Sequence, residues 1–312
     1  MGKSAVQRLH EGFEGITASK AAVIAGVSPW SSPYELYMEM TGELPPKEQT
    51  FPMWLGTQME GIVIRAFTRE TGLKCLRPHR VVDPNFWHVN EEYGFPMGAL
   101  IDAKTYDPDE AGIEAKTASA WMSTEWEEDV PLHYFMQIQH QLAVTGWDHF
   151  YCAAIVGNKY VQHIVHRDEE LIVLLTDKER DFYWNHLVPR VPPEVDGTEA
   201  TSKAIAAKWG RSEPEFIEVT NDPEVERLAQ VYMAQGKVID KAKEEREETA
   251  NRLKVTLEQR EAWVAGGYKI SWKTQARTSI ETAKLREWFP TAAELCTKKS
   301  ETRPLKVAEV KS

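Results

Sequence analysis

In DAKTYDPDEAGIEAK, residues 102–116, Asp102 lies before a turn sequence and Glu114 lies after it. Strand-forming residues flank the Asp-Pro-Asp segment, and this arrangement favours a β-hairpin. The hairpin would bring Asp102 and Glu114 together on two adjacent strands. Because positions i and i+2 of a strand share a face, Glu114 and Lys116 would point into one site, with the Ala115 carbonyl between them.

This arrangement suits the hydrolysis of a phosphodiester. That reaction needs a divalent cation held by hard oxygen ligands, usually carboxylates and a backbone carbonyl. It also needs positive charge near the phosphate oxygens, which a lysine supplies. An alternative stays open, because an acid followed later by Glu-x-Lys occurs by chance in many chains. On that alternative, the segment is an exposed hairpin with Glu114 and Lys116 on its solvent face.

Composition places the chain among acidic globular proteins. It has 312 residues, enough for one large domain or a domain with an appendage, and 42% of them are hydrophobic. No apolar run reaches membrane-spanning length and no signal peptide is evident, so we expect a cytoplasmic protein without a membrane partner. The three scattered cysteines predict neither disulfides nor an iron–sulfur site. A net charge of −11 does not favour nucleic-acid binding, although a basic groove can coexist with an acidic exterior.

The first two thirds of the chain alternate between helical and strand patterns. Residues 16–44 predict two helices, and residues 53–71 predict a long helix with Glu60 beside its apolar stripe. Short strands are predicted in LKCLRPHRVV, FWHVN, GALIDAKTY and AGIEAKT. A helix over 130–146, two more strands and an amphipathic helix follow. We therefore predict an α/β (α+β) domain over residues 1–193, with a mixed central sheet flanked by helices.

Residues 194–312 form a helical and β C-terminal extension that we expect to pack on this core. A long charged helical segment lies around residues 222–262 and could be a helical hairpin or a short coiled coil. The sequence YKISWKTQARTSI then predicts an alternating strand with Lys269, Lys273 and Arg277 on one face. Those cations could contact DNA phosphates. They could equally protect an exposed edge strand.

Several blocks in order resemble the YqaJ-type viral recombinase nucleases, relatives of phage lambda exonuclease in the PD-(D/E)xK superfamily. The blocks cover nearly the whole chain and are GITASKAAVIAGVSPWSSPYELYMEMTG, MWLGTQMEGIVIRAFTRETG, GALIDA, GIEAKT, VPLHYFMQIQHQLAVTG, DGTEATSKAI and GGYKISWKTQARTSI. The resemblance implies that Asp102, Glu114 and the Ala115 carbonyl hold Mg²⁺ as two ions, with Mn²⁺ able to replace it. It also implies that Lys116 orients or activates the attacking water.

Three further residues receive roles from this resemblance. Glu60 would complete the acidic cluster, Gln137 would brace the nucleophile region, and Ser19 would bind a terminal 5′-phosphate. The chain departs from the family pattern where Leu100 and about Met122 stand in place of two residues that grip the 5′-phosphate. Those departures bear on how a 5′-end is held and leave the metal ligands intact.

The resemblance implies a Mg-dependent 5′→3′ exonuclease that acts on double-stranded DNA ends. It would leave 3′ single strands for a single-strand annealing protein, and it would act as a ring-shaped homotrimer of a phage or prophage in the cytoplasm of its bacterial host. Two alternatives stay open: an endonuclease or nickase with the same core, and a non-catalytic DNA-binding recombination protein.

Other polar and aromatic residues are weaker candidates for site residues. His133, His140 and His149 lack a ligand spacing, although His140 lies three positions after Gln137 and so shares its helix face. Trp121 and Trp126 flank an acidic stretch and could stack on DNA ends. For each of these residues a packing role is the more common alternative.

Overall fold

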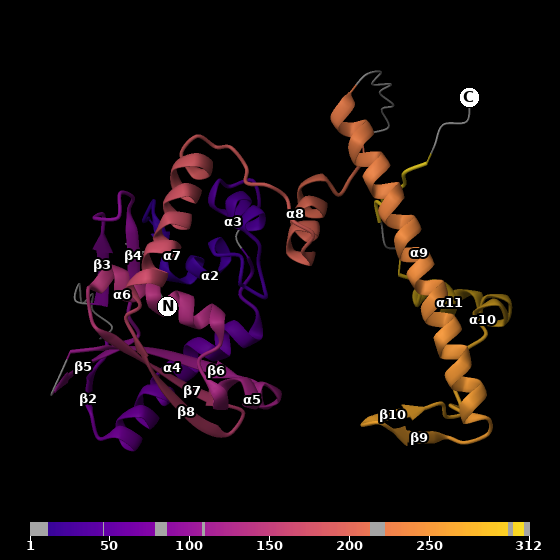
Figure 1. The fold of residues 1–312 in the computed structure, drawn as a ribbon, viewed down its shortest axis with the longest axis horizontal. Helices are drawn as coiled ribbons and strands as arrows, with labels where there is room; N and C mark the ends of the chain where they lie inside the picture. The colour runs from indigo at the N-terminus through magenta and orange to yellow at the C-terminus, as the bar shows by residue number, and fades with distance from the viewer. Residues whose placement is uncertain are drawn as a thin grey trace. The chain divides into compact units, whose positions relative to one another are not determined.

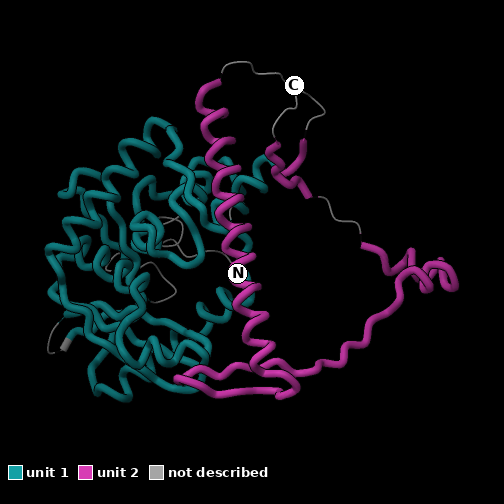
Figure 2. Tube along the Cα trace, turned by 45° about the vertical axis from the view of Figure 1, so that its right-hand side comes forward, with its two compact units in different colours: residues 1–209 teal, residues 210–312 magenta. Residues whose placement is uncertain are grey.

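The computed structural model describes residues 12–45, 47–78, 86–107, 110–212, 222–298 and 302–308. The chain divides into two compact units, residues 1–209 and 210–312 (Figure 2). The sequence places the domain boundary at residues 193/194, whereas the first unit also includes α8 (Glu199–Trp209). That helix packs against the first unit, and the Thr201 hydroxyl donates a buried 2.7 Å hydrogen bond to Ser32 Oγ.

A five-stranded mixed sheet forms the centre of the first unit (Figure 1). Its order is β2-β5-β6-β7-β8, and β6 and β7 are its parallel pair. The strands are β2 (Lys74–Leu76), β5 (Ala103–Asp107), β6 (Gly112–Ala118), β7 (His149–Val156) and β8 (Lys159–His166). Helices pack on both faces of this sheet, so the predicted α/β architecture with a mixed, helix-flanked sheet is confirmed.

A second sheet of three strands has the order β1-β4-β3. Its strands are β1 (Ile16–Thr17), β3 (Trp87–Asn90) and β4 (Met97–Leu100). The sequence predicts one strand through GALIDAKTY, and this prediction is wrong, because β4 and β5 belong to different sheets. Ile101 marks the break, where its N–H donates to the Phe86 carbonyl at 2.9 Å. Asp102 therefore lies at the junction of the two sheets.

Most helices of the first unit agree with the predicted pattern, whereas the helical segments between residues 120 and 128 were not predicted. They are α2 (Ala18–Ile24), α3 (Pro33–Met40), α4 (Phe51–Thr71), α5 (Ser123–Glu128), α6 (Leu132–Thr145) and α7 (Glu169–Asp181), with a 3-10 turn η2 (Ala120–Met122) and a π-helical turn η3 (Phe182–Leu187). The helix α4 ends at Gly72, whose φ of 73° is the left-handed conformation that glycine adopts readily.

Two apolar clusters hold the sheet between α4 and α6. Alternate residues of a strand face opposite sides of its sheet. Ala153 of β7 accordingly packs with Val63 and Phe67 of α4, whereas Cys152 packs in the cluster that includes Ile138 of α6. Because the parallel strands β6 and β7 are covered on both faces, they require apolar residues at most positions. A glutamate on β6 is therefore an exception to this pattern.

The close approach of Phe150 to Gly112 fixes the start of β6 against β7. These two residues are register partners. A Cβ atom placed on Gly112 would lie 2.1 Å from the Phe150 ring, which is closer than carbon atoms can approach. Only glycine therefore fits at the first residue of the strand that carries the Glu-x-Lys sequence.

The second unit contains one long helix, a hairpin and two short helices. The charged segment forms the single helix α9 (Pro223–Leu257), which begins where Asp222 accepts hydrogen bonds from the backbone N–H groups of residues 224 and 225. The remaining elements are β9 (Ala262–Ala265), β10 (Tyr268–Ser271), α10 (Thr282–Trp288) and α11 (Pro290–Leu295). Within the described residues, no helix is long and apolar enough to cross a bilayer.

Candidate active site

Asp102 holds the edge of β6 through its side chain. The antiparallel pairing of β5 with β6 ends at Ala103 and Ile113, where the next backbone bond would join Ala115 to Ile101. Instead, the Ala115 N–H donates to Asp102 Oδ2 at 2.9 Å. The N–H and C=O groups of one strand residue point toward the same neighbouring strand. The Ala115 carbonyl therefore lies on the same edge of β6 as the Asp102 carboxylate.

Glu114 is a buried carboxylate with three donors around it. Its side chain is only 4% exposed. Gln137 Nε2 donates to Oε1 at 2.7 Å, and Gln141 Nε2 donates to Oε2 at 2.6 Å. Lys116 Nζ lies 2.6 Å from Oε1. An ionised carboxylate this deeply buried is stable only when its oxygens are paired, and α6 supplies two of the three partners.

Lys116 shares the face of β6 that carries Glu114, as the two-residue spacing predicts. Its Nζ also donates to Gln137 Oε1 at 3.1 Å and lies 4.6 Å from the centroid of the Tyr134 ring. Burial alone would lower the pKa of Lys116, but the charges of Glu114 and Asp102 outweigh it and raise that pKa. The lysine is therefore a fixed cation of the site at neutral pH.

The third carboxylate of the cluster is Glu60, on α4. Burial and the charge of Glu114 raise its pKa. Burial, followed by the charges of Glu114 and Glu60, also raises the pKa of Asp102 well above its ordinary value. Three acidic side chains from α4, β6 and the β4–β5 junction thus lie close enough to repel one another, and Lys116 offsets only part of that repulsion.

The chemistry of this cluster fits a divalent cation. Within the described part of the chain, no three His, Cys, Asp or Glu side chains are already arranged as a metal site. The oxygens of Glu114 are instead taken by Lys116 and two glutamines. The donors are nevertheless all oxygen atoms, as Mg²⁺ prefers, and a cation would offset the repulsion among the acids. Asp102, Glu114 and the Ala115 carbonyl are the groups that would hold it.

The remaining predicted site residues are Ser19 and the basic stripe Lys269, Lys273 and Arg277. Ser19, in the first turn of α2, is exposed and forms a 3.3 Å hydrogen bond with Thr17 Oγ1. The basic stripe lies in the second unit, and its prediction as one long strand is wrong. Lys269 is in β10, but Lys273 and Arg277 follow the end of that strand because β9 offers only four partner positions. The ammonium nitrogen of Lys273 lies 3.5 Å from Glu261 Oε2.

His140 and Trp126 are packed in the core, whereas His133 lies near Lys116 and Trp121 is exposed. His140 is fully buried and pairs with Glu179, so sharing a helix face with Gln137 does not bring it to the carboxylates. His133 is buried against the Tyr134 ring, with 4.1 Å between ring centroids. Trp126 is fully buried in the core. Trp121, in contrast, is 83% exposed.

Sequence reasoning missed Gln141 and Tyr134. Gln141 lies four positions after Gln137, so both amides lie on one face of α6 and both reach Glu114. That spacing was a usable signal. The intervening Gln139 faces elsewhere, where its amide bonds the His166 carbonyl and the Asp168 N–H. Tyr134 carried no such signal, because its contact with Lys116 depends on the packing of α6 over β6.

Comparison with known proteins gives matches in sequence and in fold. Residues 8–148 match the sequence model of the YqaJ-like viral recombinase domain. The uncharacterized protein YqaJ of Bacillus subtilis (strain 168) is 29% identical over 307 residues, which cover 97% of this chain and 93% of that protein.

Two solved structures are similar at lower identity. An alkaline exonuclease from Laribacter hongkongensis, LHK-Exo, gives a TM-score of 0.46 at 19% identity, covering 57% of this chain and 90% of that chain. A phage-related exonuclease from Haemophilus somnus 129PT gives a TM-score of 0.41 at 14% identity, covering 54% of this chain and 93% of that chain. The sequence matches are the stronger findings, and the residues matched by the domain model include Glu60, Asp102, Glu114, Lys116 and Gln137. The chain therefore carries a YqaJ-like viral recombinase domain.

Proposed function

We propose that this chain is a metal-dependent deoxyribonuclease that degrades one strand of linear duplex DNA from its 5′ ends. The observation that carries the proposal is the carboxylate cluster at the edge of β6, where Asp102 bonds the Ala115 N–H and Glu114 pairs with Lys116. This cluster lies inside the YqaJ-like viral recombinase domain. A recombinase that anneals strands needs 3′ single-stranded ends, and a 5′→3′ exonuclease would produce them.

Bound Mg²⁺ would polarise the scissile phosphate and lower the pKa of a water molecule. The chain's own residues would do the rest. Asp102, Glu114 and the Ala115 carbonyl would hold the ion, and Glu60 would add negative charge beside it. The ammonium of Lys116 has three N–H donors, of which two are directed at Glu114 and Gln137. The third can donate to a phosphate oxygen or to the attacking water.

The two glutamines of α6 position the carboxylate. Gln137 bonds both Glu114 and Lys116, so it fixes the distance between the anion and the cation. Gln141 holds the second oxygen of Glu114. Charged Lys116 is suited to stabilise negative charge in the transition state, because its raised pKa keeps the proton on nitrogen. It is poorly suited to act as a general base.

We also propose a metal, an oligomeric state, a partner and a biological role for this nuclease. They are Mg²⁺ as the metal, with Mn²⁺ able to replace it, a homotrimeric ring, a single-strand annealing partner and a phage-type role in the bacterial cytoplasm. Ser19 would contact the 5′-phosphate, and Lys269, Lys273 and Arg277 would contact the DNA backbone. The viral recombinase domain, matched over residues 8–148, supports the recombination role. The positive charges of Lys269, Lys273 and Arg277 are what support their contact with phosphate.

Digestion of end-labelled DNA tests the proposal. Linear duplex labelled at either the 5′ or the 3′ end, and covalently closed circular duplex, are incubated with Mg²⁺ or with EDTA. We expect Mg²⁺-dependent loss of 5′ label from linear DNA only. Asp102→Ala should abolish it, whereas the exposed Asp148→Ala should not.

Each alternative function predicts a different result in this assay. Cutting of the circular DNA would identify an endonuclease or nickase with the same core. A folded wild-type protein that binds DNA but hydrolyses neither substrate with Mg²⁺ or Mn²⁺ would identify a non-catalytic recombination protein.

A further inference from the structure

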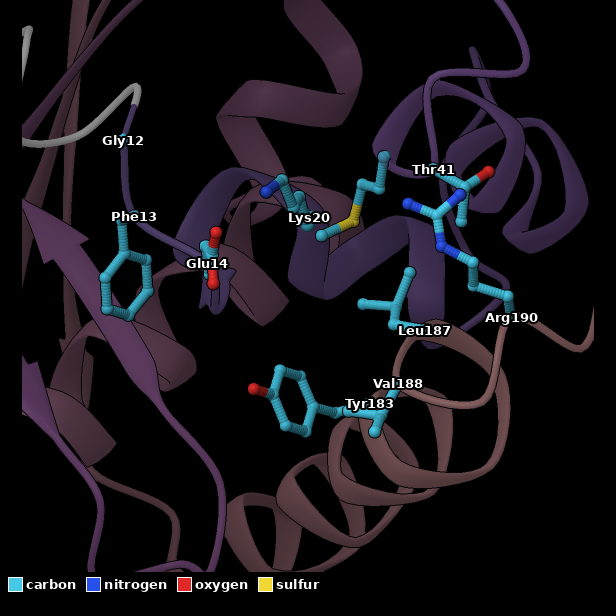
Figure 3. A pocket seen from close by; sticks show the side chains of 10 residues that line it. Gly12, Phe13, Glu14, Lys20, Thr41, Tyr183, Leu187, Val188 and Arg190 are labelled. Carbon is cyan, nitrogen blue, oxygen red and sulfur yellow. The ribbon is translucent and has the colours of Figure 1, made fainter.

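A pocket of about 560 Å³ lies in the first unit, and Figure 3 shows the side chains that line it. Part of its lining is Gly12–Glu14, which precedes β1, and β1 pairs with the first residues of β4. Asp102 lies two residues beyond Leu100, the last residue of β4. The pocket and the candidate active site are therefore at opposite ends of this strand, and no residue of the acidic cluster lines the pocket.

Two cations and one carboxylate line this pocket. Lys20 extends from α2 and Arg190 from the segment after η3, and Glu14 is the acid (Figure 3). Neither cation forms an ion pair with an acidic residue among those that the structure describes. Burial lowers the pKa of Lys20, which an unpaired ammonium with reduced access to water would show. In a chain of net charge −11, a pocket with net positive charge favours an anionic ligand.

The backbone of Arg190 is strained in a way that points to a role for its side chain. Its φ is 56°, in the left-handed region where glycine is favoured and a bulky residue is disfavoured. Backbone bonds from Arg190 N–H to the Leu187 carbonyl and from Val191 N–H to the His186 carbonyl hold this turn. Such strain is commonly kept at binding sites, and here the strained residue directs a guanidinium to the pocket.

The other walls of the pocket are suited to a flat organic group. Tyr183 contributes an aromatic ring, and Leu187 and Val188 contribute aliphatic surface. The volume falls within the range of roughly 300–1,000 Å³ that small-molecule sites occupy. We propose that this pocket binds a nucleoside monophosphate, with its phosphate between Lys20 and Arg190 and its base against Tyr183. This site is additional to the carboxylate cluster, and it does not require that the chain be a nuclease.

Calorimetric titration with dAMP in EDTA tests the proposal, because EDTA removes any metal-dependent nucleotide site. Wild-type protein should bind dAMP, and more tightly than inorganic phosphate. Lys20→Gln and Arg190→Gly should each weaken binding about tenfold or more, the usual loss for one charged hydrogen bond. Lys203→Gln, an exposed lysine outside the pocket, and Asp102→Asn should bind like wild type.

The choice of Arg190→Gly keeps folding from obscuring the result. Glycine adopts the left-handed conformation without strain, so this variant should melt at the wild-type temperature or above. The proposal is overturned by no binding of dAMP to wild type, by binding that both pocket variants retain, or by binding that Asp102→Asn abolishes. Inorganic phosphate binding as tightly as dAMP would overturn the nucleotide assignment.

Discussion

Replacing His140 by alanine separates a structural role for this histidine from a catalytic one. His140 and Glu179 are both fully buried, with His140 Nδ1 at 2.8 and 3.0 Å from the two carboxylate oxygens. His140 Nε2 lies 3.2 Å from the Gly98 carbonyl oxygen, which can only accept. This ring nitrogen therefore carries a hydrogen, and the pair ties α6 to α7 and to β4. The alanine variant would leave Glu179 buried without its partner.

The structure sets the size of the expected loss. Removing one partner from a fully buried pair costs about 3–5 kcal/mol, because the remaining charge is neither hydrated nor paired. In a domain of this size, each kcal/mol lowers the melting temperature by roughly 2–4 °C. We therefore expect His140→Ala to melt roughly 10 °C below wild type, measured by near-ultraviolet circular dichroism in EDTA.

The double variant His140→Leu/Glu179→Leu provides the matched control. Replacing both partners with apolar residues removes the unpaired charge, so most of the stability should return. At a temperature where every variant is folded, the nuclease rate should stay within about twofold of wild type, since additive effects are expected for residues without shared contacts. An unchanged melting temperature with a large loss of activity would refute this reasoning and place His140 in the active site.

Three further predictions concern the sheet and the carboxylates. Gly112→Ala should lower the free energy of unfolding by about 1–3 kcal/mol, measured with urea, because the added methyl group overlaps the Phe150 ring. Gln141→Leu should reduce Mg²⁺-dependent DNA hydrolysis roughly 10- to 100-fold, measured at saturating DNA, because it removes the donor that holds Glu114 Oε2. Asp102→Asn should abolish hydrolysis but raise the melting temperature in EDTA at pH 7, because the raised pKa of Asp102 shows that its charge destabilises the fold.

The controls differ for the three variants. Gly197→Ala adds a methyl group in open space and should leave stability nearly unchanged. For Gln141→Leu, an activity loss that follows the melting temperature would indicate a folding defect and count against a positioning role. The stability advantage of Asp102→Asn should shrink as the pH falls through the raised pKa of Asp102, and it should vanish below the unfolded value of about 4. A pH-independent difference between the two proteins would contradict that cause.

The sequence predicted those features of the site that depend on short spacing along one element. The two-residue alternation of a strand placed Glu114 and Lys116 on one face. The expected antiparallel pairing of the segments that follow Asp102 and precede Glu114 is present in β5 and β6, and Asp102 bonds Ala115 beside it. Glu60 was assigned to the acidic cluster by the family resemblance, and burial, followed by the charge of Glu114, raises its pKa. The placement of Glu114 and Lys116 used a periodicity that the local backbone geometry fixes.

Features that depend on distant partners were not predicted. The strand through GALIDAKTY divides because Ile101 bonds the backbone of Phe86, the residue that precedes β3 of the three-stranded sheet. The role of the His140 side chain depends on its hydrogen bond with Glu179 in α7, thirty-nine positions away. No local pattern distinguishes a histidine that faces a carboxylate cluster from one that faces a buried glutamate, because both positions belong to the apolar side of the same helix.

The position of Asp102 illustrates how the break between sheets creates the site. If β4 and β5 formed one continuous strand, the ladder would pair Ala115 with Ile101 through the backbone. The Ala115 N–H and carbonyl would then both form backbone hydrogen bonds with Ile101. Ile101 bonds Phe86 instead, so the Ala115 N–H at the edge of β6 donates to the carboxylate of Asp102. The irregularity that strand prediction missed is therefore what places Asp102 and the Ala115 carbonyl on the same edge of β6, where both can serve one cation.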